Sequence, residues 1–400
     1  MFRQYFRLLR QHPQFLAFGF LATFFSSFGQ TFLLGLFTDS FRTAHSLSHG
    51  EYGAIYAAAT FIGGLLLMRI GKQLDNVSLA QFTSFTFIGI ALSALVITWP
   101  IHLVTLFIGL AGLRFFGQGF MGHIAMTSMG RYFVEQRGKA VAFAGMGFPL
   151  GELLLPVLIV ALVAAYDWQV TWWLFAVFLI CGLPVMLWLQ THKPKNEVPA
   201  AVSAPDEAAA LEVALRQRDL LRQRKFWVVL PALLGLPFVV TALLLNQLWL
   251  ADQQSWSVAA TASAIMIFSL SRVTVSVFAG DWIDRLGSKR FIGLNILPVT
   301  FGTVLLAANF GVWSWWAFLG LAGVSAGINS ALSGTLWAEV YGTRYLATVR
   351  ALVHAMMVFS TALAPFLMGI LIDTGWSPTA ILLTFSAILA AAWLNARRLT

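Results

Sequence analysis

The sequence predicts an all-α protein that crosses a membrane twelve times, and three observations support this fold class. Only 10% of the 400 residues are charged, against roughly 25% in soluble domains. The mean hydropathy is +0.79. Apolar stretches of about 20 residues, each long enough to cross a hydrocarbon core of roughly 30 Å as a helix, recur along the chain. Because these stretches are continuous, they exclude a β-barrel, whose strands are shorter and alternate in polarity.

The boundaries of the expected spans follow from the apolar stretches. Trp99 and Trp313 lie at span ends, where amphipathic rings favour the headgroup layer. The expected spans are near 15–38, 50–70, 79–99, 102–130, 138–163, 169–190, 226–250, 256–279, 290–309, 312–337, 345–372 and 376–396.

The basic residues predict the orientation. If the N-terminus is cytoplasmic, all of the 25 Lys and Arg residues except Arg42, Arg114 and Arg272 fall at the cytoplasmic side. This is the positive-inside bias, so we expect a multi-pass protein of the cell inner membrane with both termini in the cytoplasm. The net charge of +9 is then explained by this bias and by anionic lipid headgroups, and no nucleic-acid partner is expected. The basic start of the chain is expected to be a retained first helix rather than a signal peptide.

Short repeats predict two parallel six-helix halves. "GKQLD" (71–75) and "GDWID" (280–284) share Gly and Asp at the same relative places, and Pro156 and Pro365 are separated by the same interval. A polar, Pro- and Ala-rich stretch between the halves continues into an amphipathic pattern, which predicts either a helix on the membrane surface or a regulatory element. The expected parts are an N-terminal half (1–190), a cytoplasmic central loop with an amphipathic helix (191–225) and a C-terminal half (226–400).

A charged hairpin, "GDWIDRLGSKR" (280–290), interrupts the apolar sequence. Its Gly280, Asp284, Arg285, Gly287 and Lys289 resemble the hallmark motif of the major facilitator superfamily, which lies between spans two and three and again between spans eight and nine. The first copy keeps Gly71 and Asp75 but has Asn76 where the motif has a basic residue.

This resemblance implies twelve helices, alternating access and a gating role for both hairpins. Gly280 is expected to let two helices approach closely. Glu339, Arg344 and Arg350 are expected to pair with the second hairpin as gate residues. "RFFGQG" (114–119) resembles the family's fourth-span motif, and an isolated Arg272 is similar to that of monocarboxylate and oxalate/formate-like carriers. Glycine rows that include Gly147, Gly151, Gly323 and Gly327 are expected to pack helices closely rather than to bind phosphate.

Few ionisable side chains lie within the spans, where a charge is costly and usually faces a cavity or a partner. Arg272 is the first candidate for binding an anionic substrate group, because a guanidinium stays charged and offers a bidentate fork; the alternative is an Arg paired with backbone carbonyls. Arg114 either contacts substrate or braces helices. The amides of Gln30, Asn246 and Asn329 either orient a substrate or join helix to helix.

Two further groups are candidates for proton coupling. Burial can raise the pKa of the Glu152 carboxyl until it carries a proton, whereas pairing with Arg114 would make it structural. His354 could relay a proton, although a histidine bonded within a helix interface is the simpler interpretation, and the same holds for His123. No metal or other cofactor is expected, since the single Cys181 lies in an apolar span and no HExxH motif occurs.

These features predict a secondary transporter, not an enzyme, that moves a small organic anion of the carboxylate type together with protons across the lipid bilayer. A monomer is expected. The alternative in the same class is a proton-driven exporter of drugs or metabolites, with a wide, aromatic-lined cavity governed by Glu152. A polytopic membrane enzyme is the alternative of another class, but the acid-poor spans offer few catalytic candidates. A receptor is also compatible with the spans, although the sequence offers no output domain.

Overall fold

The computed structural model describes residues 8–71, 74, 76–133, 135–194, 218–341 and 346–399. Most of these residues are helical, and none of them lies in a strand. Twelve segments are long and apolar enough to cross a membrane. The predicted all-α fold with twelve spans is therefore confirmed.

The spans formed by one helix each are α5 (His49–Ile70), α6 (Leu79–Val96), α11 (Trp168–Thr191), α13 (Arg224–Leu245), α15 (Val258–Leu286), α16 (Ser288–Ala308), α17 (Val312–Tyr341), α18 (Leu346–Asp373) and α19 (Pro378–Ala396). The first, fourth and fifth spans are built from shorter pieces: α2 (Pro13–Phe25), η1 (Ser26–Gly29) and α3 (Thr31–Leu34); α7 (Leu103–Gly112), η3 (Leu113–Met121) and α8 (Gly122–Tyr132); and α9 (Arg137–Gly145) and α10 (Gly147–Ala165). The short α4 (Thr38–His45), α14 (Gln247–Gln253) and η4 (Arg397–Leu399) lie outside the spans.

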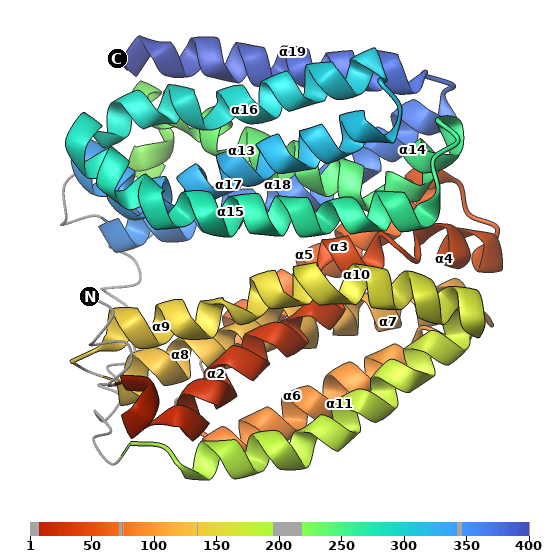
Figure 1. The fold of residues 1–400 in the computed structure, drawn as a ribbon, viewed down its shortest axis with the longest axis vertical. Coiled ribbons are helices and arrows are strands. Elements are labelled where there is room, and N and C mark those ends of the chain that lie inside the picture. The colour runs from red at the N-terminus through yellow and green to blue at the C-terminus, as the bar shows by residue number, and fades with distance from the viewer. Residues whose placement is uncertain are drawn as a thin grey trace. The chain divides into compact units, whose positions relative to one another are not determined.

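The chain packs as two compact units. The first comprises Met1–Leu47 and Ile55–Val202, and the second comprises Ser48–Ala54 and Ser203–Thr400. In the first unit α6 runs along α11, and in the second unit α17 runs along both α15 and α16 (Figure 1). Helix α5 is divided between the units, because its first residues pack within the second unit and the rest pack within the first.

Glycines determine how closely several of these helices approach. A Cβ atom at Gly327 of α17 would lie 2.8 Å from the Arg272 carbonyl oxygen of α15, and one at Gly323 would lie 2.8 Å from the Ser271 Cβ. In the first unit, a Cβ at Gly147 or Gly151 of α10 would overlap side-chain oxygens of α2 and η1. Close helix packing at these four glycines is therefore confirmed.

Gly280 behaves differently. A Cβ atom there would meet nothing within 4 Å in the part of the chain that the structure describes. The expectation that Gly280 lets two helices approach closely is therefore wrong. The glycine that the hairpin needs is Gly287, whose φ of +83° is a backbone conformation that other residues rarely adopt.

Large apolar side chains cover the outside of the spans, and Trp99 and Trp313 at span ends are 57% and 69% exposed. This surface suits contact with acyl chains and headgroups rather than with water. The expected amphipathic helix of the central loop lies largely outside the described residues.

Candidate functional site

The first span is interrupted near its middle by a short polar stretch. Ser26–Gly29 forms a 3-10 turn, Gln30 is extended (φ −83°, ψ 151°), and the helix resumes as α3. Serine and glycine are poor helix formers, and Gly29 has a further steric role. A Cβ atom at Gly29 would overlap the Leu113 carbonyl oxygen and would lie 2.9 Å from the Gly117 Cα. The break therefore brings the backbone of span one against that of span four.

At the point where span one approaches it, span four forms a π-helix, η3, over Leu113–Met121. Such wide turns are rare, and they are frequent at functional sites. A Cβ atom at Gly117 would lie 2.8 Å from the Gly29 nitrogen and 2.8 Å from its Cα. The two glycines consequently make a backbone-to-backbone contact that no other residue type would allow.

Arg114 lies at the start of η3 and is only 3% exposed. Its NH1 donates to the Gly29 carbonyl at 2.8 Å, and its Nε donates to the Thr60 hydroxyl at 3.0 Å. The guanidinium carbon lies 5.1 Å from the centre of the Tyr56 ring. The Tyr56 hydroxyl is in turn 2.7 Å from the Thr31 hydroxyl. We call Gly29, Thr31, Tyr56, Thr60 and Arg114 the Arg114 cluster.

The Arg114 cluster joins spans one, two and four. A helix break leaves carbonyl groups without a partner in the helix, and the guanidinium supplies one for Gly29. This geometry is that of a brace, one of the two roles that the sequence left open for Arg114. Direct contact of Arg114 with substrate stays a prediction. Tyr56 and Thr60 were not singled out from the sequence.

The amides of Gln30 and Asn246 lie where a helix is interrupted, Gln30 within the first span and Asn246 directly after the seventh. Gln30 Nε2 donates to the Ser26 hydroxyl at 3.1 Å. Asn246 separates α13 from α14 with a non-helical backbone (φ −104°, ψ 21°), and its Nδ2 donates to the Ala242 carbonyl at 3.0 Å. Substrate binding by these amides stays a prediction.

Arg272 lies in the middle of α15 and is half-buried. Its guanidinium carbon lies 5.4 Å from the centre of the Phe268 ring, one turn earlier on the same helix. The backbone at Arg272 is fixed by the close approach of Gly323 and Gly327 of α17. A cation is therefore held at mid-span by a rigid helix pair within the second unit.

The other polar candidates are distributed over both units. Glu152 follows Gly151 on α10 in the first unit and is half-buried. His354 is exposed on α18 in the second unit. Asn329 of α17 accepts a hydrogen bond at 3.3 Å from the Nδ2 of Asn295 on α16, which corresponds to the helix-joining role. Proton coupling by Glu152 and His354 stays a prediction.

The second charged hairpin is attached to the end of α17. Glu339 accepts a hydrogen bond from the Ser288 backbone N–H at 3.0 Å, and the Ser288 hydroxyl donates to Thr335 at 2.9 Å. Glu339 thus contacts the hairpin, while Thr335 was not anticipated. Arg285 and Arg350 are exposed. Of the other proposed gate residues, Asp75 and Arg344 lie outside the described residues, and only the backbone of Asp284 is described.

The first hairpin is attached to span four. His123 Nε2 lies 3.0 Å from the Gly71 carbonyl oxygen, and because a carbonyl only accepts, this nitrogen carries the proton. Arg131 NH1 donates to the Leu74 carbonyl at 3.4 Å. The simpler interpretation of His123, a histidine bonded between helices, is confirmed.

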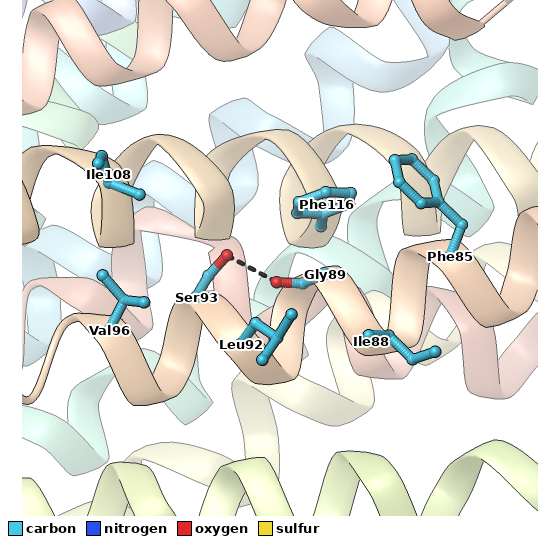
Figure 2. Close-up of a pocket in the computed structure, with 8 residues that line it drawn as sticks. All are labelled: Phe85, Ile88, Gly89, Leu92, Ser93, Val96, Ile108 and Phe116. Carbon is cyan, nitrogen blue, oxygen red and sulfur yellow. Dashed lines mark hydrogen bonds between the residues drawn. The ribbon is translucent and has the colours of Figure 1, made fainter.

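A lateral cavity of about 290 Å³ lies between α6, α7 and η3 (Figure 2). Its walls are apolar, including Phe85, Ile88 and Phe116, and its one hydroxyl, that of Ser93, donates to the Gly89 carbonyl at 2.7 Å. None of the predicted site residues lines this cavity. Among the described residues, no three His, Cys, Asp or Glu side chains are grouped as metal ligands would be.

A fold of twelve candidate membrane spans, with a buried Arg114 and a half-buried Arg272 inside them, is that of a polytopic membrane protein. The Major Facilitator Superfamily profile matches residues 19–246 and 236–399. The chain belongs to the major facilitator superfamily. Its members are transporters and not enzymes, which agrees with the prediction from the sequence.

Individual relatives are distant. The hexuronate transporter of Escherichia coli (strain K12) is 24% identical over 287 residues, which span 64% of this chain and 64% of that relative. The nucleoside transporter NupG has a similar fold, with a TM-score of 0.73 and 12% identity over 97% of this chain and 98% of its own. An inward-facing bacterial homologue of the human lysosomal transporter Spinster gives a TM-score of 0.72 at 14% identity, over 96% of each chain.

Proposed function

We propose that the protein is a secondary transporter that moves a small organic anion of the carboxylate type, together with protons, by alternating access. The observation that carries the anionic substrate is Arg272, a half-buried guanidinium in the middle of a membrane span. A charge at this depth is costly and is retained where it serves a partner or a substrate. A guanidinium matches a carboxylate through two parallel hydrogen bonds.

The relative named as a hexuronate transporter supports a more specific substrate class. A hexuronate combines one carboxylate with several hydroxyl groups. Arg272 would bind the carboxylate, and the amides of Gln30, Asn246 and Asn329 would bind hydroxyl groups, because an amide both donates and accepts hydrogen bonds. The main role of Arg114 would be structural, because its bond to the Gly29 carbonyl holds the backbone next to Gln30.

Glu152 and His354 are the groups that we propose for proton coupling. Each can change charge within a span, and Glu152 lies on α10 beside the closely packed Gly151. Substrate and proton would then bias the two access states through contacts that differ between them. The hairpins clamped by Arg131 and Glu339 would be the gates on the side of the termini.

The proposal extends to the cellular setting. The bias of basic residues supports cytoplasmic termini, and the Escherichia coli relative supports a bacterial inner membrane. We propose a monomer with an N-terminal half over 1–190 and a C-terminal half over 226–400.

The test is uptake by purified protein in proteoliposomes under pH gradients of either direction. The panel contains radiolabelled glucuronate and galacturonate, a monocarboxylate, a nucleoside and a cationic dye. Arg272→Ala should raise the half-saturating concentration of the transported anion roughly 10- to 150-fold, since a hydrogen bond to a charged group contributes about 1.5–3 kcal/mol. The matched control is Arg42→Ala, because Arg42 pairs with Asp39 at 3.2 Å outside the spans.

Two results would overturn this proposal. Transport of the nucleoside or the dye alone, unaffected by Arg272→Ala, would favour the alternative, a proton-driven exporter of drugs or metabolites. Anion uptake that ignores the pH gradient in both directions and survives Glu152→Gln would remove the proton from the mechanism.

A further inference from the structure

The first turn of α5 has an unusual set of caps. A helix begins with four backbone N–H groups that have no partner within the helix. Ser48 and Glu51 satisfy two of the N–H groups here, because the Ser48 N–H donates to Glu51 Oε2 at 2.8 Å and the Glu51 N–H donates to the Ser48 hydroxyl at 3.2 Å. This reciprocal pair is a capping box. The capping box does not satisfy the other two N–H groups of the first turn, those of His49 and Gly50.

Asp373, the last residue of α18, accepts both remaining hydrogen bonds. The His49 N–H donates to Oδ1 at 3.0 Å, and the Gly50 N–H donates to Oδ2 at 2.7 Å. The carboxylate therefore completes, in bidentate fashion, the cap of a helix more than 300 residues away in the sequence. A negative charge is also favoured at this end of a helix by the helix dipole.

Glycines allow the two helix ends to meet backbone to backbone. A Cβ atom at Gly50 would lie 2.8 Å from Asp373 Oδ2, and one at Gly53 would lie 2.7 Å from the Phe366 Cα. A Cβ at Gly369 would lie 2.5 Å from the His49 carbonyl oxygen. A side chain at Gly53 or Gly369 would meet backbone atoms and push the start of α5 away from α18, whereas one at Gly50 would displace the Asp373 carboxylate.

Two further observations favour a contact that is made and released. The Asp373 side chain is exposed, so water can replace its hydrogen bonds at little cost. Helix α5 is continuous, yet its first residues pack with the second unit and the remainder packs with the first.

We propose that Asp373 is a latch, which holds the start of α5 on the end of α18 in one access state and releases it in the other. The inference rests on the proposed alternating access. By the predicted orientation the latch lies on the side opposite the termini, where it would close the path while the other side is open. The hairpin gates lie at the opposite ends of the spans.

The test measures backbone exchange and distance in the full-length protein in lipid nanodiscs, so it needs no substrate. Hydrogen–deuterium exchange of peptides covering 47–54 should become about fivefold faster in Asp373→Ala, which corresponds to about 1 kcal/mol, the usual contribution of an N-cap. Asp373→Asn, which keeps one acceptor oxygen, should give a smaller increase. Asp252→Ala is the matched control, since Asp252 is an exposed carboxylate of the same unit outside this contact.

Spin labels at Ser46→Cys and Thr374→Cys, in a Cys181→Ser background, report whether the helix ends separate. In Asp373→Ala the population at the longer distance should rise about fivefold relative to the shorter one. Unchanged exchange in both Asp373 variants would overturn the latch. Faster exchange with superimposable distance distributions would also overturn it, because Asp373 would then be a static cap. If the latch behaves as expected but no anion is transported, the proposed substrate fails while the latch stands.

Discussion

Replacing Arg114 by methionine tests whether this side chain is a brace. The substitution keeps an apolar stem of similar length but removes the hydrogen bonds to Gly29 at 2.8 Å and to Thr60 at 3.0 Å. Each bond to a charged donor contributes about 1.5–3 kcal/mol, and the Tyr56 ring adds about 1 kcal/mol. The variant no longer pays the free-energy cost of taking a cation out of water, and this offsets part of the loss. We therefore expect the free energy of unfolding to fall by about 3–5 kcal/mol.

Unfolding in mild detergent, followed by tryptophan fluorescence, measures this change. Arg114→Lys should recover only part of the stability, because an ammonium does not reproduce the planar fork that reaches both partners. Thr60→Val should cost about 1 kcal/mol, as it removes one acceptor. A loss below about 1 kcal/mol in Arg114→Met, together with weakened anion binding, would refute the brace and make Arg114 a substrate residue.

Two more changes probe the break in span one and the second hairpin. Gly29→Ala would place a Cβ against the Leu113 carbonyl and should lower the thermal midpoint and the folded yield, whereas Gly138→Ala, where a Cβ meets nothing within 4 Å in the described structure, should leave both unchanged; equal midpoints would contradict the close approach. Glu339→Ala should speed amide exchange at Ser288 about fivefold, because it loses a cap that contributes roughly 1 kcal/mol. Glu339→Gln keeps an acceptor oxygen, so its exchange rate should lie between those of the unmodified protein and Glu339→Ala. Identical exchange in all three proteins would show that the Ser288 contact does not hold the hairpin.

The span count is predictable because an apolar run of about 20 residues has one stable arrangement in hydrocarbon, a helix with its own hydrogen bonds satisfied. The glycine rows were predictable for a similar reason, since only small residues let helices touch. The break at Ser26–Gly29 was not predicted, because the poor helix formers of "SSFG" lie inside a longer apolar run that indicates a continuous span. The second cause of the break is tertiary, because Gly29 packs against Gly117, and nothing in the sequence around Gly29 identifies that partner.

The partners of buried polar groups escaped prediction for the same physical reason. Arg114 could be identified from the sequence because a charged side chain within a membrane span is costly in free energy. Its partners Tyr56 and Thr60 come from another span, and nothing in the sequence distinguishes them from other residues of α5. Gly280 shows the opposite error, because a motif glycine suggested a close contact that the described structure lacks. Asp373 and Thr335 were overlooked because a single polar residue at a span end resembles any other.

The two hairpins are held by side chains of opposite charge, and the backbone groups that these side chains bond explain why. Arg131 donates to the Leu74 carbonyl, four residues after α5 ends at Ile70, and a carbonyl can only accept a hydrogen bond. Glu339 accepts from the Ser288 N–H at the N-terminal end of α16, where the partial charge is positive. Arg131 thus matches a backbone carbonyl and Glu339 a backbone N–H, so exchanging the two side chains should weaken both hairpins although the net charge is unchanged. Arg131 near the end of span four and Glu339 near the end of α17 thus carry opposite charges, and the backbone group that each one bonds determines the sign.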